Sequence, residues 1–310
     1  MNVAVVIPVY NRPGLIRRAL ASVNAQSHPP SRVIVVDDGS QDDTAQSARR
    51  WLTENARFAW DVVTIPNGGP AAARNAGAAR IAEDVAYVAF LDSDDEWPAD
   101  FLSGCAERLA ERPDAVGAVV DRQTLRDGLP YALDDMSRFA ADPFLFVLEN
   151  GGGLVQCCVF RLSSFRKAGG FDALWRTGED GKLLFGVAVQ GPFLHSGGAP
   201  VIVHQRTATT VDGDAMSVSL ASARDYWIWA DQMERMIAAL PKDTRRARYD
   251  AICVIMIERW AVARRTLQAG GLSLLAARAG WRRFLWKKRR RFRRRLSESL
   301  GWRGQAPVSR

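Results

Sequence analysis

The sequence predicts an α/β fold with a Rossmann-like, mostly parallel sheet flanked by helices. Over the first 120 residues, short and almost wholly apolar runs alternate with segments of helical periodicity, and polar residues follow directly after several of the runs. Runs that are apolar throughout are typical of parallel strands, which are covered on both faces. Alternating strands and helices are joined by right-handed crossovers, which produces a parallel sheet.

The expected elements follow in order from the spacing of the apolar residues. The first run ends at Asn11-Arg12-Pro13, and Pro13 suits the first turn of a helix. Strands are expected at 3–9, 32–36, 62–65, 87–91 and 116–120, with helices near 13–23, from about 43, at 71–82 and at 99–112. Beyond residue 120 the pattern loosens, and it indicates one further strand at 157–160 and two helices at 221–240 and 245–268.

Size and composition exclude several classes of protein. The chain has 310 residues, of which 47% are hydrophobic, so it can bury a substantial core and is not mainly disordered. No apolar stretch approaches the roughly 18 residues of a membrane-spanning helix, and the N-terminal residues do not resemble a secretory signal. The four cysteines show no CxxC spacing, so neither a zinc site nor a disulfide framework is indicated, and a reducing cytoplasm is expected.

Carboxylates cluster after two of the predicted strands. Asp37 and Asp38 follow the second strand, and Asp92, Asp94 and Asp95 follow the fourth. The carboxyl ends of parallel strands meet at one edge of the sheet, where ligands bind. Crowded carboxylates cannot all stay ionised unless a cation or hydrogen-bond donors compensate them, and Mg²⁺ or Mn²⁺ with nucleotide phosphates is a natural compensating cation. The alternative is that these are solvated turn acids or helix N-caps.

Two familiar nucleotide-binding motifs are missing from the sequence. The turn after the first strand contains no GxGxxG, and no GxxxxGK[ST] occurs anywhere in the chain. A nucleotide would therefore be held through a metal and side chains rather than by a glycine-rich loop.

Four segments together resemble the successive motifs of family 2 glycosyltransferases, which have the GT-A fold. They are VVIPVYNR at 5–12, VVDDGS at 35–40, GPAAARNAG at 69–77 and FLDSDD at 90–95. The order of the four motifs makes the resemblance specific. It is weaker from residue 120 to about 215, and it stops before the C-terminal helices.

The resemblance also implies a domain organisation. Residues 1–215 would form the GT-A domain, in which 1–120 bind the nucleotide sugar and 121–215 bind the acceptor and supply catalysis. A helical extension at 216–280 and a basic amphipathic tail at 281–310 would follow.

The resemblance implies inverting transfer of a sugar from a UDP-, GDP- or dTDP-linked donor to a hydroxyl of a saccharide or lipid-linked acceptor. Such a reaction would serve cell-surface polysaccharide or glycolipid synthesis. Asp94, within the DxD motif Asp92-x-Asp94, would ligate the metal, and Asp92 would hold the ribose or a metal-bound water. The nucleotide-sugar-binding residues would be Pro8, Tyr10, Arg12, Asp38, Arg74, Asp92 and Ser93.

The general base is expected in an acidic pair that opens a helix. Glu179 and Asp180 precede Leu183 and Leu184 in that pattern, and the resemblance implies that Asp180 is the base with Glu179 as its helper. A positioned base contributes typically about 10²–10⁴ in rate. The alternative is an acidic pair placed at a helix N-terminus only because the helix dipole favours it there.

The histidines are less informative. His204 lies where some relatives place a metal-binding residue, and His195 is its rival for that role. A lone histidine is more often structural than a ligand.

Two other functions stay open on the sequence. A metal-dependent nucleotidyltransferase also gathers acids at a sheet edge, and it would release pyrophosphate rather than a nucleoside diphosphate. A non-catalytic sugar-nucleotide or membrane-binding module would bind the donor without turnover. The QxxRW motif of processive synthases is missing, which favours single sugar additions over polymerisation.

The basic charge is concentrated at the C-terminus. Residues 281–310 contain 12 Lys and Arg and one acid, which leaves the remaining 280 residues with a net charge of −3. Wound as a helix, 281–300 has an apolar stripe beside basic residues, which suits the surface of an anionic membrane. A nucleic-acid partner is a less favoured interpretation of this charge. The alternative without any partner is a solvated, disordered tail. The expected location is the cytoplasm, with peripheral contact at the inner face of the membrane.

Overall fold

The computed structural model describes residues 2–150, 153–174, 178–205, 210–211, 214–215 and 237. The chain divides into two units, Met1–Leu220 and Ala221–Arg310, and all but one of the described residues belong to the first. The helices predicted at 221–240 and 245–268, apart from residue 237, and the basic tail lie outside the described residues.

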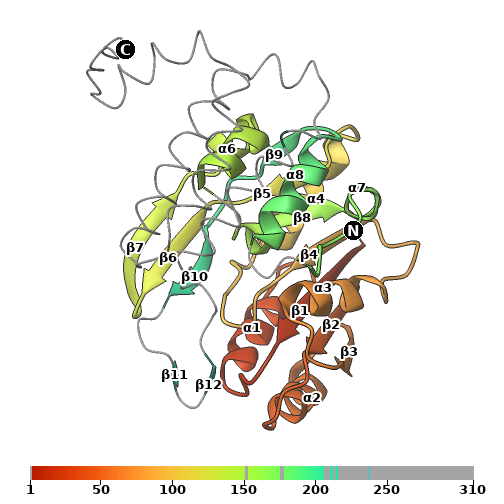
Figure 1. Ribbon diagram of the computed structural model, residues 1–310, viewed down its shortest axis with the longest axis vertical. Coiled ribbons are helices and arrows are strands. Elements are labelled where there is room, and N and C mark those ends of the chain that lie inside the picture. Colours follow the sequence, from red (N-terminus) through yellow and green to blue (C-terminus); the bar gives the residue numbers. More distant parts are fainter. Residues whose placement is uncertain are drawn as a thin grey trace, which may run out of the picture. The chain divides into compact units, whose positions relative to one another are not determined.

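A seven-stranded sheet forms the centre of the first unit, in the order β3-β2-β1-β4-β8-β5-β9 (Figure 1). Only β8 runs antiparallel to its neighbours β4 and β5. This confirms the predicted mostly parallel sheet. The strands are β1 Val3–Val9, β2 Arg32–Asp37, β3 Ala59–Thr64, β4 Tyr87–Phe90, β5 Gly117–Val119, β8 Cys158–Arg161 and β9 Phe193–His195.

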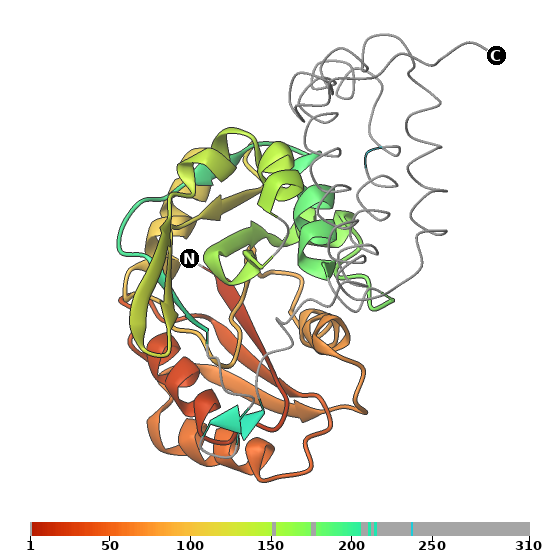
Figure 2. The same cartoon turned by 60° about the vertical axis from the view of Figure 1, so that its left-hand side comes forward.

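The first helices cover opposite faces of this sheet. The chain steps outward from β1 to β3 through α1 and α2, which contact one another, and then returns through α3 to β4 on the far side of β1. Because crossovers are right-handed, this reversal places α3 on the other face, as Figure 2 shows. The helices are α1 Leu15–Asn24, α2 Thr44–Asn55, α3 Pro70–Ala78, α4 Phe101–Glu111, α5 Ser137–Ala141, α6 Pro143–Asn150, α7 Leu162–Lys167 and α8 Glu179–Ala188, with a 3₁₀ turn η1 at Val155–Cys157.

The core is built on the strands that the sequence marks most clearly. Every residue of β1 and β4 is buried. Helix α3 lies directly against β1, because a Cβ added to Gly77 would come within 2.4 Å of Val6 Cγ1. The small residues of the ARNAG segment therefore let the helix that carries Arg74 approach the sheet closely.

A second, three-stranded sheet was not expected from the sequence. It has the order β10-β6-β7, with β6 Arg122–Arg126, β7 Leu129–Asp134 and β10 Val201–Gln205. The edge strand β7 exposes three large apolar side chains, those of Leu129, Tyr131 and Leu133. The apolar residues of this strand are therefore not its buried ones, and the apolar pattern does not reveal the strand. A short ladder joins β11 Thr210–Val211 to β12 Asp214–Ala215.

Two predicted boundaries differ from the structure for identifiable reasons. The third strand begins at Ala59 rather than 62, because it is the sheet edge and its half-exposed residues are not uniformly apolar. The predicted 71–82 helix ends at Ala78, ahead of a turn. Among the described residues, no helix is long and apolar enough to cross a membrane.

Candidate functional site

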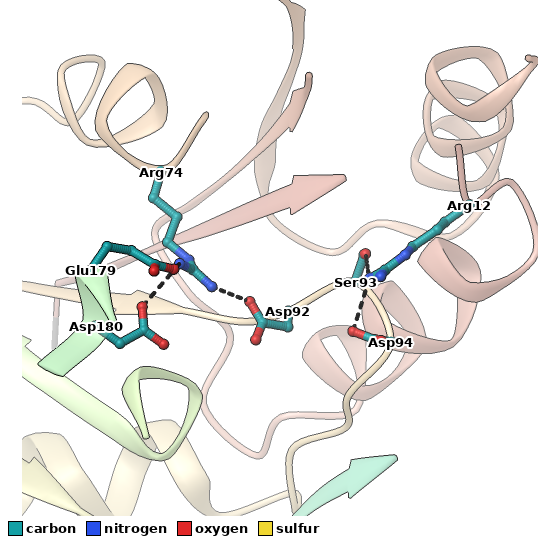
Figure 3. Close-up of polar contacts among 7 residues, drawn as sticks. All are labelled: Arg12, Arg74, Asp92, Ser93, Asp94, Glu179 and Asp180. Atoms are coloured by element: carbon teal, nitrogen blue, oxygen red, sulfur yellow. Dashed lines mark hydrogen bonds and ion pairs between the residues drawn. The ribbon is translucent and has the colours of Figure 1, made fainter. Parts of the chain in front are cut away.

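The predicted site residues gather at the carboxyl edge of the central sheet. Arg12 follows β1, Asp38 follows β2, and the DxD segment follows β4. Arg74 reaches this edge from α3, and Glu179 and Asp180 reach it from the first turn of α8, as Figure 3 shows. Residues from distant parts of the chain thus meet as parallel strands predict.

Arg74 links the DxD segment to the acidic pair. Its Nη2 donates to Asp92 Oδ1 at 2.6 Å, and its Nη1 donates to Glu179 Oε1 at 3.1 Å and to Asp180 Oδ1 at 3.0 Å (Figure 3). Only 4% of the Arg74 side chain is exposed. One buried guanidinium therefore holds three carboxylates in a fixed arrangement.

Burial and charge act in opposite directions on these groups. Burial alone would lower the pKa of Arg74, but the surrounding carboxylates more than offset this and raise it, so Arg74 stays charged. Burial raises the pKa of Asp180, Arg74 lowers it, and Glu179 and Asp92 raise it, so that the pKa lies at about 8. Asp180 can therefore accept or release a proton near neutral pH.

The second carboxylate of the DxD segment has its own arginines. Arg12 Nη1 lies 3.0 Å from Asp94 Oδ1 and donates to Ser93 Oγ at 3.1 Å (Figure 3). Arg18, from α1, donates to the backbone carbonyl of Asp94 and lies 3.4 Å from Glu96 Oε1. Burial raises the pKa of Asp94, and the negative charge of Asp92 raises it too. The positive charges of Arg12 and Arg18 lower it.

The DxD segment fits a divalent cation chemically. Among the described residues, Asp92 and Asp94 each use Oδ1 in the ion pairs above, which leaves Oδ2 of each as a hard oxygen donor. Burial raises the pKa of Asp95 well above its usual range, and the charges of Asp94 and Asp92 raise it further. A bound cation would relieve this crowding of carboxylates.

His204 lies beside this segment rather than among its carboxylates. Its Nε2 lies 2.7 Å from Glu96 Oε1, and its backbone N–H donates to Asp95 Oδ1 at 3.0 Å. An isolated bridge between Glu96 and Ile202 ties the segment to β10. His204 thus helps to fix the loop in place, and its role as a metal ligand stays a prediction.

The other histidine belongs to a separate group of candidate metal ligands. In the described part of the chain, one group of three candidate ligands has all its ligand atoms within 4.8 Å of one another, and it consists of Asp121, Asp135 and His195. His195 Nε2 lies 2.7 Å from Asp121 Oδ1, which also accepts the backbone N–H of Met136. Asp121 follows β5 and His195 ends β9, which lie two and three strands away from β4, and Asp135 follows β7 of the small sheet.

Asp38 holds the loop that leads into α3. Its two carboxylate oxygens accept the backbone N–H groups of Gly68 and Gly69, each at 2.8 Å. Burial raises the pKa of Asp38, although the two backbone bonds lower it. Pro8 is buried within β1, and Tyr10, at the end of that strand, is 37% exposed. The predicted base and ribose residues therefore border one accessible edge.

Sequence patterns did not indicate several residues that support the site. Arg18 is one, because a single arginine on a helix carries no distinguishing signal. Asn75 is another, because its side-chain N–H donates to the backbone carbonyl of Phe171 and its side-chain oxygen accepts the backbone N–H of Phe171. The centre of the Phe171 ring lies 5.1 Å from Cζ of Arg74. No local sequence pattern indicates this contact of Phe171 with α3.

The match to known families decides the classification. The family model described as glycosyl transferase family 2 matches residues 4–168. The chain belongs to this family. The match covers the four motif segments and β8, whereas Glu179, Asp180 and His204 lie beyond its end.

Two curated relatives are similar over shorter segments. The succinoglycan biosynthesis protein ExoW of Rhizobium meliloti is 46% identical over 102 residues, which are 33% of this chain and 32% of the relative. The putative teichuronic acid biosynthesis glycosyltransferase TuaG of Bacillus subtilis is 37% identical over 129 residues, which are 41% of this chain and 50% of the relative. The matched region thus spans half or less of each of these relatives.

Solved structures confirm the GT-A fold. Residues 1–349 of S. aureus TarS in complex with UDP-GlcNAc superpose with a TM-score of 0.65 at 20% identity, covering 84% of this chain and 72% of TarS. The mannosyltransferase PcManGT of Pyrobaculum calidifontis, in complex with GDP-Man and Mn²⁺, superposes with a TM-score of 0.59 at 17% identity, covering 97% and 84%.

Proposed function

We propose that this family 2 member is an inverting glycosyltransferase that moves a sugar from a nucleotide-diphosphate donor to an acceptor hydroxyl. The observation that supports this most is the Arg74 network. It links Asp92 of the DxD segment to Asp180, the candidate base, through one buried guanidinium. A donor site and a base held at a fixed spacing are what a single displacement at a sugar carbon needs.

The donor is a UDP-, GDP- or dTDP-linked sugar, bound along the carboxyl edge. Pro8, Tyr10 and Arg12 would line the base and ribose, and Asp38 would accept a hydrogen bond from the base. TarS bound to UDP-GlcNAc and PcManGT bound to GDP-Man share this fold, which supports a donor of this class. The sugar is a hexose in this proposal, which makes the enzyme a hexosyltransferase.

Asp92 and Asp94 are the residues that would hold Mn²⁺ or Mg²⁺, with His204 as a further candidate ligand. The bound ion would neutralise the charge that develops on the departing nucleoside diphosphate. Arg12 and Arg74 add fixed positive charge beside the same carboxylates. The Mn²⁺ in the PcManGT complex supports this choice of metal.

Asp180 would accept the proton of the attacking hydroxyl. The carboxylate form is required for this, and the pKa of about 8 makes it a stronger base than an ordinary aspartate. Arg74 fixes the orientation of Asp180, and Glu179 shares that contact. The acceptor would be a saccharide or lipid-linked sugar in cell-surface polysaccharide or glycolipid synthesis, as the names of ExoW and TuaG suggest for those relatives.

The basic residues of 281–300 would hold the enzyme against the anionic inner face of the membrane, where a lipid-linked acceptor resides. The strong positive charge of this segment motivates the proposal.

A screen of nucleotide sugars tests the reaction class. The purified chain is incubated with UDP-, GDP- and dTDP-linked sugars with Mn²⁺, with Mg²⁺ and with EDTA. We expect metal-dependent release of a nucleoside diphosphate from one of these donors. Release of pyrophosphate from a nucleoside triphosphate instead would indicate a nucleotidyltransferase, and donor binding without any turnover would indicate a binding module.

A further inference from the structure

Gln156 is a buried polar residue whose side-chain oxygen, Oε1, lacks a hydrogen-bond partner among the described residues. It lies in η1, just before β8, and is only 4% exposed. Buried acceptors are nearly always paired, so an unpaired one calls for an explanation, and a missing ligand is one.

The backbone around Gln156 is firmly held. Its carbonyl accepts the indole N–H of Trp97 at 2.6 Å, and the N–H of Val120 donates to the carbonyl of Cys157 at 3.0 Å. Val155 and Cys157 on either side are fully buried. The unpaired amide oxygen therefore belongs to a rigid part of the fold, as is usual for groups that bind a ligand.

The sheet register places Gln156 in the middle of the site edge. Ala89 pairs with Val159, and Val119 pairs with Cys158. Because β8 runs antiparallel to β4, the N-terminal end of β8, where η1 lies, is beside the carboxyl end of β4 that leads into Asp92. The η1 turn contacts β4, so Gln156 lies close to the start of the DxD segment.

We propose that Gln156 binds a hydroxyl of the donor sugar through its side-chain amide. This inference rests on the proposed function. The sugar is attached to the diphosphate, which the DxD segment would bind. Gln156 Oε1 is a buried, unpaired acceptor close to that segment, so it is placed to accept a hydrogen bond from a sugar hydroxyl. The contact would select for the sugar and not for the nucleotide.

The test compares sugar nucleotides with bare nucleotides in calorimetric titrations with Mn²⁺ present. UDP-GlcNAc is paired with UDP, and GDP-mannose with GDP, for the wild type and Gln156→Leu. We expect Gln156→Leu to weaken the bound sugar nucleotide about tenfold and the bare nucleotide less than twofold, the size expected of one hydrogen bond.

Gln190→Leu is the matched control, because the amide of Gln190 is already bonded to the carbonyls of Ser164 and Gly186. It should change neither affinity. Should Gln156→Leu not fold, monodeoxy analogues of UDP-GlcNAc or GDP-mannose bound to the wild type replace it, and removal of one hydroxyl should cost about tenfold. Equal effects on sugar nucleotide and bare nucleotide, or no analogue that binds more weakly, would overturn the inference. If the wild type binds neither nucleotide nor sugar nucleotide, the proposed function itself has failed.

Discussion

At the scale of single residues, the site is organised by arginines. Arg74 and Arg12 each neutralise one carboxylate of the DxD segment, and Arg74 also holds the candidate base. An arginine suits this role because its planar fork donates several hydrogen bonds at fixed angles. Removing a buried partner of this kind leaves unpaired charges, so the network is needed for the geometry as well as for the charge.

The ionisation of Asp180 predicts a pH dependence of the transfer reaction. Its pKa of about 8 means that the carboxylate form, which a base requires, increases as the pH rises through that value. We expect kcat/KM to rise about tenfold per pH unit below pH 8 and to level off above it. The profile is measured from pH 5.5 to 9.5 with donor and acceptor subsaturating.

The control for this profile is donor binding at the same pH values, which reveals any titration of the nucleotide or its metal. A rate that is flat from pH 6 to pH 9, with donor binding also flat, would show that Asp180 does not act as the base.

At the scale of elements, the sequence predicts the half of the fold in which burial is complete. Strands β1, β2 and β4 are apolar because they are covered on both faces, and their ends locate the site carboxylates. The small sheet could not be predicted in the same way, because β7 exposes apolar residues. The contact of Arg74 with Asp180 joins positions 106 residues apart, and no local pattern encodes it.

The close approach of α3 to β1 predicts the effect of one substitution. Gly77→Ala would place a methyl group 2.4 Å from Val6 Cγ1, so the helix that carries Arg74 would have to move. We expect a loss of about 1–3 kcal/mol in the free energy of unfolding, measured by urea denaturation.

Gly104→Ala in α4 is the matched control. Its Cβ would meet only the hydroxyl of Ser196 at 3.1 Å, and alanine favours helix, so stability should stay level or rise by up to about 1 kcal/mol. If Gly77→Ala were as stable as Gly104→Ala, the packing of α3 against β1 would be misassigned.

At the scale of the whole molecule, a mildly acidic body precedes a basic C-terminal segment. The proposed membrane contact predicts that the full chain sediments with vesicles containing phosphatidylserine at low salt. Release is expected as ionic strength rises, since screening shortens the reach of surface charge to about 8 Å at 0.15 M. Neutral phosphatidylcholine vesicles are the control. Failure to sediment with anionic vesicles at low salt would rule the contact out.

The central claim is that the carboxylates at the tip of β4 and at the start of α8 perform the transfer. The most direct measurement is the initial rate of sugar transfer, with the donor that the screen identifies, by Asp94→Asn and Asp180→Asn, beside the exposed control Asp114→Asn. We expect each site variant to lose at least about 100-fold in rate while it still unfolds in one cooperative transition, and the control to keep its rate. Near-normal rates in both folded site variants would contradict the claim.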